Sequence, residues 1–409
     1  MTQSSTPLVL KHSWTTDTLD TGDIHDQLNR LWRELQLAGP QDQWDPDDSS
    51  DSGHFASGVM RANTLNLLVI VSSDDEAQAA VDTIIRVRDF LPTRSIILIM
   101  RNRPEDDPPE YDISVELLNQ QSSRATGPEA GLRFETITIG IPVQEAGHVP
   151  SLVDPLFIPE LEDFLWWPGG NHVNFQLYED LLPLVDRVIV DSAQFVRDTR
   201  EQEDFRRLID IGENVLTLGD FTWDRLAPWR SLLAQFFDPP DTQKCLDTID
   251  QVTIHYAYNR AEGGSGAPAA FLIVGWLASR LGWEIIDPLI RRKDGNYWAP
   301  LRAQSGDKGR EIVLRIIPDL SQHAKFSLRS VELAAGGSTP GTFKVERTDS
   351  DDLMTSSETS TNPFVSRMVF SRRPDPVNML GEELRRLSRD LIYEEAAQFA
   401  IRLTESAPS

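Results

Sequence analysis

The feature that most constrains the fold is an alternation of short apolar runs with amphipathic segments in the first half of the chain. Residues 65–71 form a continuous apolar run of strand length, and residues 76–90 have helical periodicity. A strand that is apolar throughout is buried on both faces, and strands alternating with helices build a largely parallel sheet covered on both sides. The sequence therefore predicts an α/β region. Further strands are expected at 95–100, 133–139, 163–167 and 186–191, and a helix at 175–182.

The second half of the chain has a different pattern. An apolar helix is expected at 269–281, followed by segments with a period of two. Grouped strands flanked by helices indicate a smaller antiparallel α+β domain. The predicted strands are 284–286, 311–317, 325–333, 342–347 and 368–371, and two helices are expected at 379–390 and 393–404.

A chain of 409 residues is too long for one ordinary core, so two domains are expected. The sequence Asp238-Pro239-Pro240-Asp241 predicts the boundary. The expected organisation is a loose tail over 1–20, an N-terminal α/β domain over 21–238 and a C-terminal α+β domain over 239–409. Two segments are expected to lie outside the sheets. One is an inserted loop with a short helix around 115–120, and the other is a mobile loop over 348–362.

Composition excludes several classes of function. The formal net charge of -25 argues against binding to nucleic acid or to anionic membranes, both of which need basic patches. The one cysteine, Cys245, excludes an internal disulfide and a cysteine-based zinc site. The first twenty residues are polar and no apolar run reaches the length of a bilayer span, so a cytoplasmic protein is expected.

No catalytic, metal-binding or cofactor-binding pattern is recognised. None of the seven histidines forms the i, i+4 pair of a helical metal site, and no Gly-x-Ser-x-Gly nucleophile motif occurs. The segment Gly263-Gly264-Ser265-Gly266 lacks the lysine of a P-loop and the spacing of a dinucleotide fingerprint. The chain is accordingly predicted not to be an enzyme, and to carry no cofactor and no metal.

Two aromatic segments are the strongest candidates for a functional surface. The strand at 163–167 ends in Trp166 and Trp167, and Pro168 and Gly169 then force a turn shortly before His172. Ligands and partners gather where such strands run out into loops, although tryptophans can equally form the wall of a core.

The second segment runs from Trp223 to Arg230 and places two tryptophans and two arginines within eight residues. Tryptophan and arginine are the residues most enriched at interface hot spots. Core packing is an equally good interpretation of this segment.

Five motifs in order resemble one family, the glucose-6-phosphate dehydrogenase assembly proteins known as OpcA. The motifs lie at 164–169, 186–192, 220–230, 275–283 and 382–396, so the resemblance covers nearly the whole chain. It implies a non-catalytic protein that assembles or activates glucose-6-phosphate dehydrogenase, and so supports NADPH production in the oxidative pentose phosphate pathway. The candidates for partner binding are Trp166, Trp167, Pro168, Gly169, His172, Trp223, Arg225, Trp229, Arg230, Arg385 and Arg386.

Two rival interpretations stay open. The first domain could bind a sugar phosphate or a nucleotide at the loop from Trp166 to His172, as a sensor or an enzyme. The protein could also be a scaffold that forms a complex without changing the kinetics of the dehydrogenase. Members of the family in phototrophs are linked to thioredoxin through cysteine pairs, and with Cys245 alone such control is doubtful here.

Overall fold

The computed structural model describes residues 8–37, 63–87, 91–104, 108–121, 131–169, 174–196, 200–212, 217–258, 265–304, 309–320, 327–360, 363–371, 374–386 and 388–405. The chain forms two compact units. The first contains Met1–Pro168, Asn174–Ile189 and Leu380–Arg385, and the second contains Gly169–Val173, Val190–Met379 and Arg386–Ser409. The boundary expected at Asp238 falls inside the second unit, because Trp229, Leu232 and Leu233 belong to the core of that unit.

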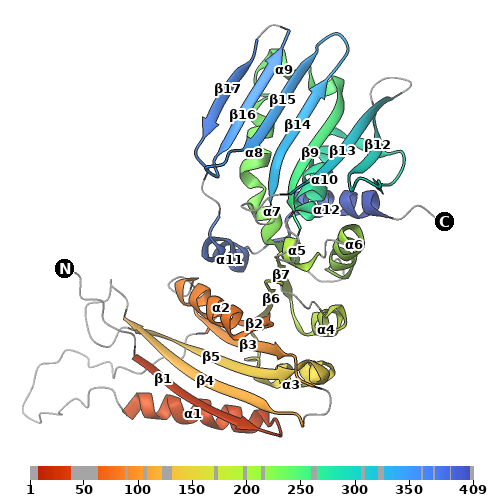
Figure 1. Cartoon of the computed structure of the whole chain (residues 1–409). Coiled ribbons are helices and arrows are strands. Elements are labelled where there is room, and N and C mark those ends of the chain that lie inside the picture. Colours follow the sequence, from red (N-terminus) through yellow and green to blue (C-terminus); the bar gives the residue numbers. More distant parts are fainter. Residues whose placement is uncertain are drawn as a thin grey trace, which may run out of the picture. The chain divides into compact units, whose positions relative to one another are not determined.

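The first unit is built on a sheet with helices on both faces (Figure 1). Its strands follow the order β1-β4-β5-β3-β2-β6-β7. The pairs β2–β3, β2–β6 and β3–β5 are parallel, whereas β1–β4 and β4–β5 are antiparallel. The elements are β1 (Leu8–Thr16), α1 (Thr21–Leu37), β2 (Leu65–Val71), α2 (Asp74–Val87), β3 (Thr93–Arg101), β4 (Tyr111–Gln121), β5 (Gly131–Pro142), α3 (Val149–Val153), β6 (Glu162–Trp167), α4 (Phe175–Leu181) and β7 (Arg187–Val190).

The parallel part of this sheet confirms the predicted α/β class. All seven residues of β2 are buried, as a strand covered on both faces requires. Helices α1 and α2 lie on opposite sides of the sheet (Figure 1). A buried ion pair positions α1, because Glu135 of β5 accepts hydrogen bonds from Trp32 Nε1 at 2.6 Å and from Arg94 Nε at 2.7 Å.

Two expectations for this unit were wrong. Residues 8–16 of the predicted loose tail form β1, and the predicted helix around 115–120 is part of the strand β4. The two strands pair with each other over nine residues, Leu8–Thr16 with Tyr111–Asn119. Neither segment has a clear strand pattern in its own sequence. The hydrogen bonds between the two segments stabilise both of them as strands.

The second unit contains a nine-stranded sheet with the order β10-β12-β13-β9-β14-β15-β16-β17, and β11 pairs with β12. Its elements are α5 (Ser192–Phe195), α6 (Glu201–Gly212), β8 (Thr217–Asp220), α7 (Phe221–Arg225), α8 (Ala227–Gln235), α9 (Pro240–Gln243), β9 (Ile249–Tyr258), α10 (Ala267–Leu281), β10 (Trp283–Ile285), β11 (Ile290–Arg291), β12 (Tyr297–Ala303), β13 (Arg310–Leu320), β14 (Leu328–Ala335), β15 (Gly341–Arg347), β16 (Leu353–Thr359), β17 (Val365–Val369), α11 (Pro376–Arg385, shared with the first unit) and α12 (Leu391–Thr404).

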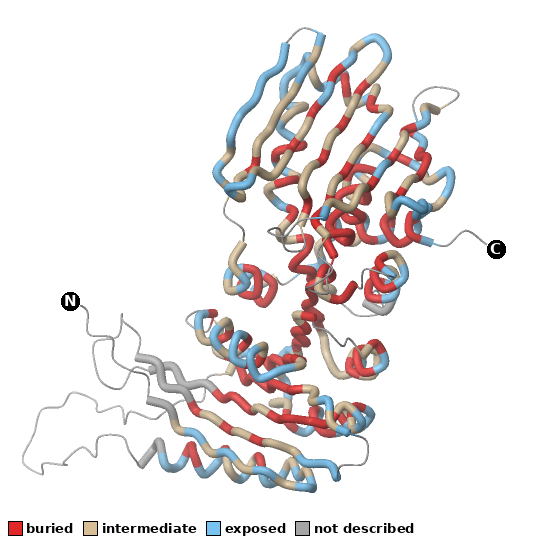
Figure 2. Tube along the Cα trace, viewed as in Figure 1, coloured by how far each residue is buried: buried red, intermediate tan, exposed pale blue. Residues whose placement is uncertain are grey.

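One face of this sheet packs against helices and the other is open. Helix α8 contacts β15 and α10 contacts β9, and both helices lie behind the strands in Figure 1. Burial alternates along the strands, as Figure 2 shows and as Phe343 and Val345 of β15 illustrate. Such alternation is typical of a sheet with one face in the core. The core of the unit therefore lies between the sheet and its helices.

The sheet is mixed rather than wholly antiparallel, because β9 and β13 are parallel neighbours. Parallel strands need a long crossover connection, and α10 lies within the one that joins them. The predicted mobile loop at 348–362 was wrong in part, since residues 353–359 form β16 between β15 and β17. Helix α10 approaches α12 closely at Gly275, where a Cβ atom would lie 2.0 Å from the carbonyl oxygen of Ala396.

Candidate functional site

The segment Trp223–Arg230 folds as α7 and α8, which meet at Leu226. The Trp223 side chain is buried, and its Nε1 donates a hydrogen bond to Asp390 Oδ2 at 3.0 Å. Its ring packs against Tyr393, with ring centroids 5.6 Å apart. Because Asp390 also caps α12, Trp223 fastens α7 to the start of that helix within the second unit.

Trp229 is equally internal, and Arg230 next to it is partly buried. Trp229 is 1% exposed, and the guanidinium of Arg347 lies 5.5 Å from the centre of its ring. The guanidinium of Arg230 lies 3.5 Å above the ring of Trp223 and donates to the Trp223 carbonyl oxygen at 2.8 Å. Burial lowers the pKa of Arg230 to about 10, so the side chain stays charged at neutral pH. These contacts give the segment a structural role in the core.

Arg225 belongs to a buried charge cluster at the starts of α5 and α7. Its guanidinium holds the carboxylate of Asp191 with both terminal nitrogens, through Nη1 to Oδ2 at 3.0 Å and through Nη2 to Oδ1. Thr222 Oγ1 donates to Asp191 Oδ1 at 3.0 Å. Asp220 Oδ1 accepts from the backbone nitrogens of Thr222 at 2.8 Å and Ser192 at 3.1 Å. The cluster therefore fixes the ends of two helices.

Burial, with the charge of Asp191 as a second cause, raises the pKa of Asp220 to about 6. Burial also raises the pKa of Asp224 to about 6, against the opposing charge of Arg386, whose Nη2 lies 3.6 Å from Asp224 Oδ1. Carboxyl groups with such values can exchange protons near neutral pH. A reaction would additionally need space for a substrate beside them.

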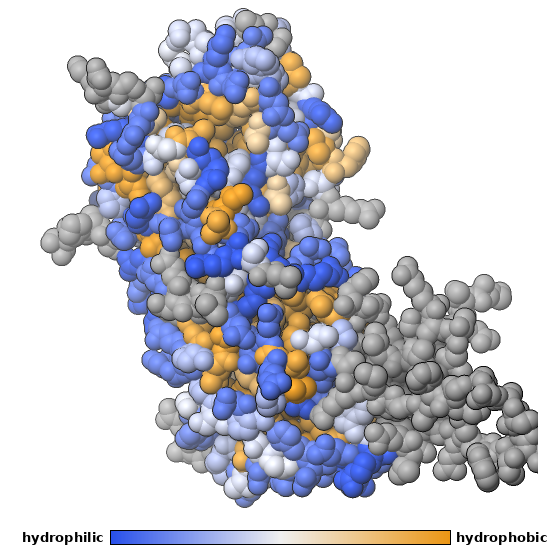
Figure 3. Space-filling view, turned by 180° about the vertical axis from the view of Figure 1, so that it is seen from behind, coloured by the Kyte–Doolittle hydropathy of each residue, from blue (hydrophilic) through white to orange (hydrophobic). Residues whose placement is uncertain are grey.

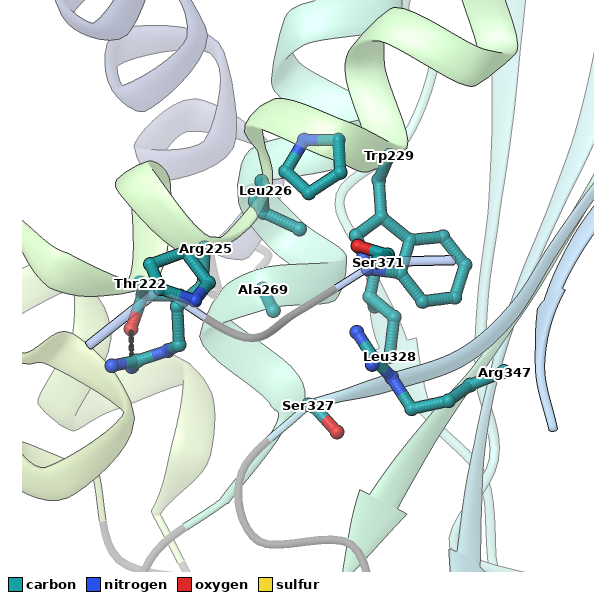
Figure 4. A pocket seen from close by; sticks show the side chains of 11 residues that line it. Thr222, Arg225, Leu226, Trp229, Ala269, Ser327, Leu328, Arg347 and Ser371 are labelled. Atoms are coloured by element: carbon teal, nitrogen blue, oxygen red, sulfur yellow. Dashed lines mark hydrogen bonds between the residues drawn. The ribbon is translucent and has the colours of Figure 1, made fainter. Parts of the chain in front are cut away.

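The cavity next to this cluster is too small for a metabolite. It has a volume of about 20 Å³ and is lined by Arg225, Leu226, Trp229, Ser327 and other residues of the second unit (Figure 4). Such a volume holds about one water molecule, whereas small-molecule pockets have volumes of roughly 300–1,000 Å³. The cluster is therefore best explained as a structural node.

A second buried acid, Glu201 at the start of α6, was not singled out from the sequence. Tyr256 and Tyr297 donate their hydroxyls to Glu201 Oε2 at 2.9 and 2.5 Å, and Ser265 donates to Oε1. Burial raises the pKa of Glu201 although these three hydroxyls favour the charged form. An open cavity of about 370 Å³ lies beside Glu201, with Arg200, Arg206 and Arg291 among its lining residues. Because the partners of Glu201 come from segments far apart in the chain, no local motif reveals the cluster.

The tryptophan pair in β6 is also buried. Trp166 and Trp167 are both core residues of the first unit, and Trp167 meets Tyr178 edge to face with centroids 5.9 Å apart. Gly169 has a φ of 100°, and a Cβ atom there would lie 2.2 Å from Gln194 Cβ, so the turn requires glycine. Pro168 is partly exposed. His172 lies outside the described residues, so the expected loop site at 166–172 stays a prediction.

The two arginines at the end of α11 differ in their surroundings. Arg385 is exposed and lies 3.3 Å from Glu382 on the same helix. Arg386 is partly buried between Asp224 and Asp390. Of the candidate residues with described side chains, Arg385 alone is exposed. Partner binding by any of the candidate residues stays a prediction, and the buried ones can affect it only through the fold.

The surface holds one feature that the sequence did not reveal. Four of the nine large apolar side chains recorded as exposed among the described residues are Phe364, Val365, Met368 and Phe370, in or beside β17. A strand was expected at 368–371, but only the sheet order shows that β17 is at an edge. Seen from behind the view of Figure 1, hydrophobic side chains form several separate patches among hydrophilic ones (Figure 3).

Among the described residues, no group of three or more histidine, cysteine, aspartate or glutamate side chains has the geometry to hold a metal ion. None of the helices in the part of the chain that the structure describes is long and apolar enough to cross a membrane.

Comparison with known proteins gives matches to curated relatives. The "Putative OxPP cycle protein OpcA" of Nostoc punctiforme is 31% identical over 216 residues, which are 52% of this chain and 43% of the relative. The protein of the same name in Synechocystis sp. is 33% identical over 136 residues, or 33% of this chain and 27% of the relative. The matches thus span less than half the length of these relatives.

Solved structures with a similar course of the chain are oxidoreductases of low identity. One from Bacillus cereus is 11% identical, with a TM-score of 0.44, and the match covers 85% of this chain and 97% of that one. An inositol dehydrogenase homologue from Azotobacter vinelandii, complexed with NAD+, is 10% identical with a TM-score of 0.39, covering 83% and 86%. No activity follows from similarity at this level.

Family models match both halves of the chain. The N-terminal domain of the glucose-6-phosphate dehydrogenase subunit matches residues 84–207, and its C-terminal domain matches residues 216–397. The two matches lie in the order of the family's domains and together cover most of the chain. The protein thus belongs to the family of glucose-6-phosphate dehydrogenase assembly proteins, OpcA.

Proposed function

We propose that this protein is a non-catalytic partner of glucose-6-phosphate dehydrogenase, which it binds in the cytoplasm to assemble or activate the enzyme. The observation that carries the proposal is the ordered match of two domains of a dehydrogenase subunit to residues 84–207 and 216–397. The buried cluster around Arg225 agrees with it, because its side chains bond to one another and the cavity beside it holds about one water molecule.

Activation requires that the protein bind one state of the dehydrogenase more tightly than another. A partner shifts an equilibrium between conformations or oligomers only through this difference in affinity. The expected kinetic consequence is a lower KM for glucose 6-phosphate, a higher kcat, or both. The segment Trp223–Arg230 takes part indirectly, since Trp223 and Trp229 lie in the core of the second unit.

The test is a titration of purified dehydrogenase from the same organism with the full chain. NADPH formation is followed while the concentration of substrate is varied at each level of added protein. A saturable change in kcat or KM supports activation, and the saturation point gives the stoichiometry. Complex formation on a sizing column with unchanged kinetics indicates a scaffold instead, and the absence of both effects refutes the proposal.

The same purified protein separates the sensor interpretation from this one. Calorimetry with glucose 6-phosphate and with NADP, in the absence of the dehydrogenase, measures whether the protein binds either ligand alone. Binding of one of them, without an effect on the enzyme, favours a sensor. If calorimetry detects no binding of either ligand and the protein activates the enzyme, the partner role is favoured.

A further inference from the structure

Strand β17 forms one end of the nine-stranded sheet. It pairs with β16 on one side, and among the described residues no strand pairs with its other side. We call this side the β17 edge, and it comprises residues Phe364–Phe370. An unpaired edge presents a row of backbone N–H and C=O groups, and a partner can add an extended segment to it.

Several large apolar side chains of the β17 edge are exposed. Phe370 is 88% exposed and Phe364 is 66% exposed, and Val365 and Met368 are about half exposed. Proteins usually protect their edges with charges, proline or a covering element. Within Phe364–Phe370 the one charged side chain is Arg367, and the segment contains no proline.

The register with β16 shows which way these side chains face. Val369 lies opposite Leu353, whose side chain is fully buried, so Val365, Arg367 and Val369 share the face that packs on the helices. Met368 lies opposite Met354, on the open face of the sheet. Apolar groups therefore border the β17 edge on both faces.

The pattern of the β17 edge opposes pairing with a second copy of the chain. The order Phe364-Val365-Ser366-Arg367-Met368-Val369-Phe370 is nearly symmetric about its centre. Antiparallel pairing of two copies over the full length would match phenylalanine with phenylalanine and valine with valine, but would place the two copies of Arg367 opposite each other. Like charges directly opposite are destabilising in a sheet, whereas opposite charges are favourable.

We propose that the β17 edge is where this protein docks on glucose-6-phosphate dehydrogenase, by receiving an extended segment with an acidic side chain opposite Arg367 and apolar side chains beside Phe364 and Phe370. The inference rests on the proposed function and adds the contact to it. Backbone hydrogen bonds supply affinity in this mode of binding, and the side chains at alternate positions supply selectivity.

The test uses purified full-length variants titrated against the dehydrogenase, with activation and co-elution as readouts. Phe370→Ser removes an apolar contact and Arg367→Glu reverses the central charge, and each is expected to raise the concentration for half-maximal activation at least about tenfold. Arg367→Lys keeps the charge and is expected to stay close to wild type. Because these side chains are exposed, Tm should change by no more than about 2 °C.

Two matched controls separate the β17 edge from general surface effects. Leu320→Ser replaces an apolar side chain that is 82% exposed at the end of β13, and Arg315→Glu reverses an exposed charge on the same strand. Both are expected to titrate like wild type. A comparable loss in these controls would show that the effect is not specific to the β17 edge, which overturns the assignment.

Three further outcomes are distinct. If Phe370→Ser and Arg367→Glu activate like wild type, the assignment of the β17 edge is wrong although the proposed function stands. If wild type neither binds nor activates the dehydrogenase, the proposed function fails and this inference fails with it. If wild type is a dimer that Phe370→Ser converts to a monomer with normal activation, the edge binds a second copy, which also overturns the inference.

Discussion

Replacing Asp220 by asparagine should stabilise the protein at neutral pH. The carboxyl group is buried and lies near the charge of Asp191, and its pKa is raised from 3.8 to about 6. The difference of about 2 pKa units corresponds to about 3 kcal/mol by which the charged form is disfavoured in the folded state. Asparagine has the same shape and keeps an Oδ1 that can accept from the backbone nitrogens of Thr222 and Ser192.

The pH dependence follows from the sign of this shift. Between about pH 4 and pH 6 the folded state binds a proton at Asp220 and the unfolded state does not, so stability falls as pH rises through this window. The stabilisation by Asp220→Asn should therefore be largest, up to about 3 kcal/mol, at pH 7.5. It should fall to about half of that at pH 5 and to about 0.5 kcal/mol at pH 4.

Denaturant unfolding of wild type and variant at pH 5 and pH 7.5 measures this difference. The exposed Asp241 provides a control, because Asp241→Asn should leave the free energy of unfolding within about 0.5 kcal/mol at both pH values. A variant that is less stable than wild type at pH 7.5 would refute the reasoning. A stabilisation of equal size at the two pH values would show that the charge of Asp220 is not its source.

The remaining predictions concern side chains at the centre of the second unit. Trp229→Ala should lower the free energy of unfolding by about 3–5 kcal/mol, because the ring is 1% exposed. Trp298→Ala, at a partly exposed position, should lower it clearly less. Equal decreases of Tm in the two variants would contradict the burial argument. Glu201→Gln should lower the free energy of unfolding by about 1–3 kcal/mol, since an amide offers one acceptor oxygen to three hydroxyl donors. Glu203→Gln, at an exposed position, should leave the stability unchanged. A Tm for Glu201→Gln at or above that of wild type would refute this account.

The sequence was sufficient to predict the helices and strands that have a clear hydrophobic pattern. The run 65–71 was predicted as a strand and forms β2 with the same bounds, and the apolar helix expected at 269–281 is α10 at Ala267–Leu281. Both elements are buried on nearly all sides, so their apolar composition alone indicates that they lie in the core. The family was also evident from five motifs, because their order along the chain is more specific than any one of them alone.

Elements stabilised by a neighbour far away in the chain were not predictable in this way. Residues 115–120 have no decisive period, and they form a strand because β1 and β5 pair with both of its edges. Residues 353–359 are rich in serine and threonine, which suit a loop, yet β15 and β17 hold them as β16. Pairing over long sequence separation overrides local propensity in such strands.

The sequence by itself determined the class of the fold, the acidic character of the protein and its family. Only the tertiary structure decided that Trp223 and Trp229 lie in the core. Tryptophan is common both at interface hot spots and in protein cores, so the residue type alone does not distinguish the two. The same holds for the phenylalanines at 364 and 370, which the sequence alone would place in a core as readily as on a surface. Their exposure depends on β17 being the last strand of the sheet, and the position of a strand in a sheet is set by its pairing partners rather than by its own residues.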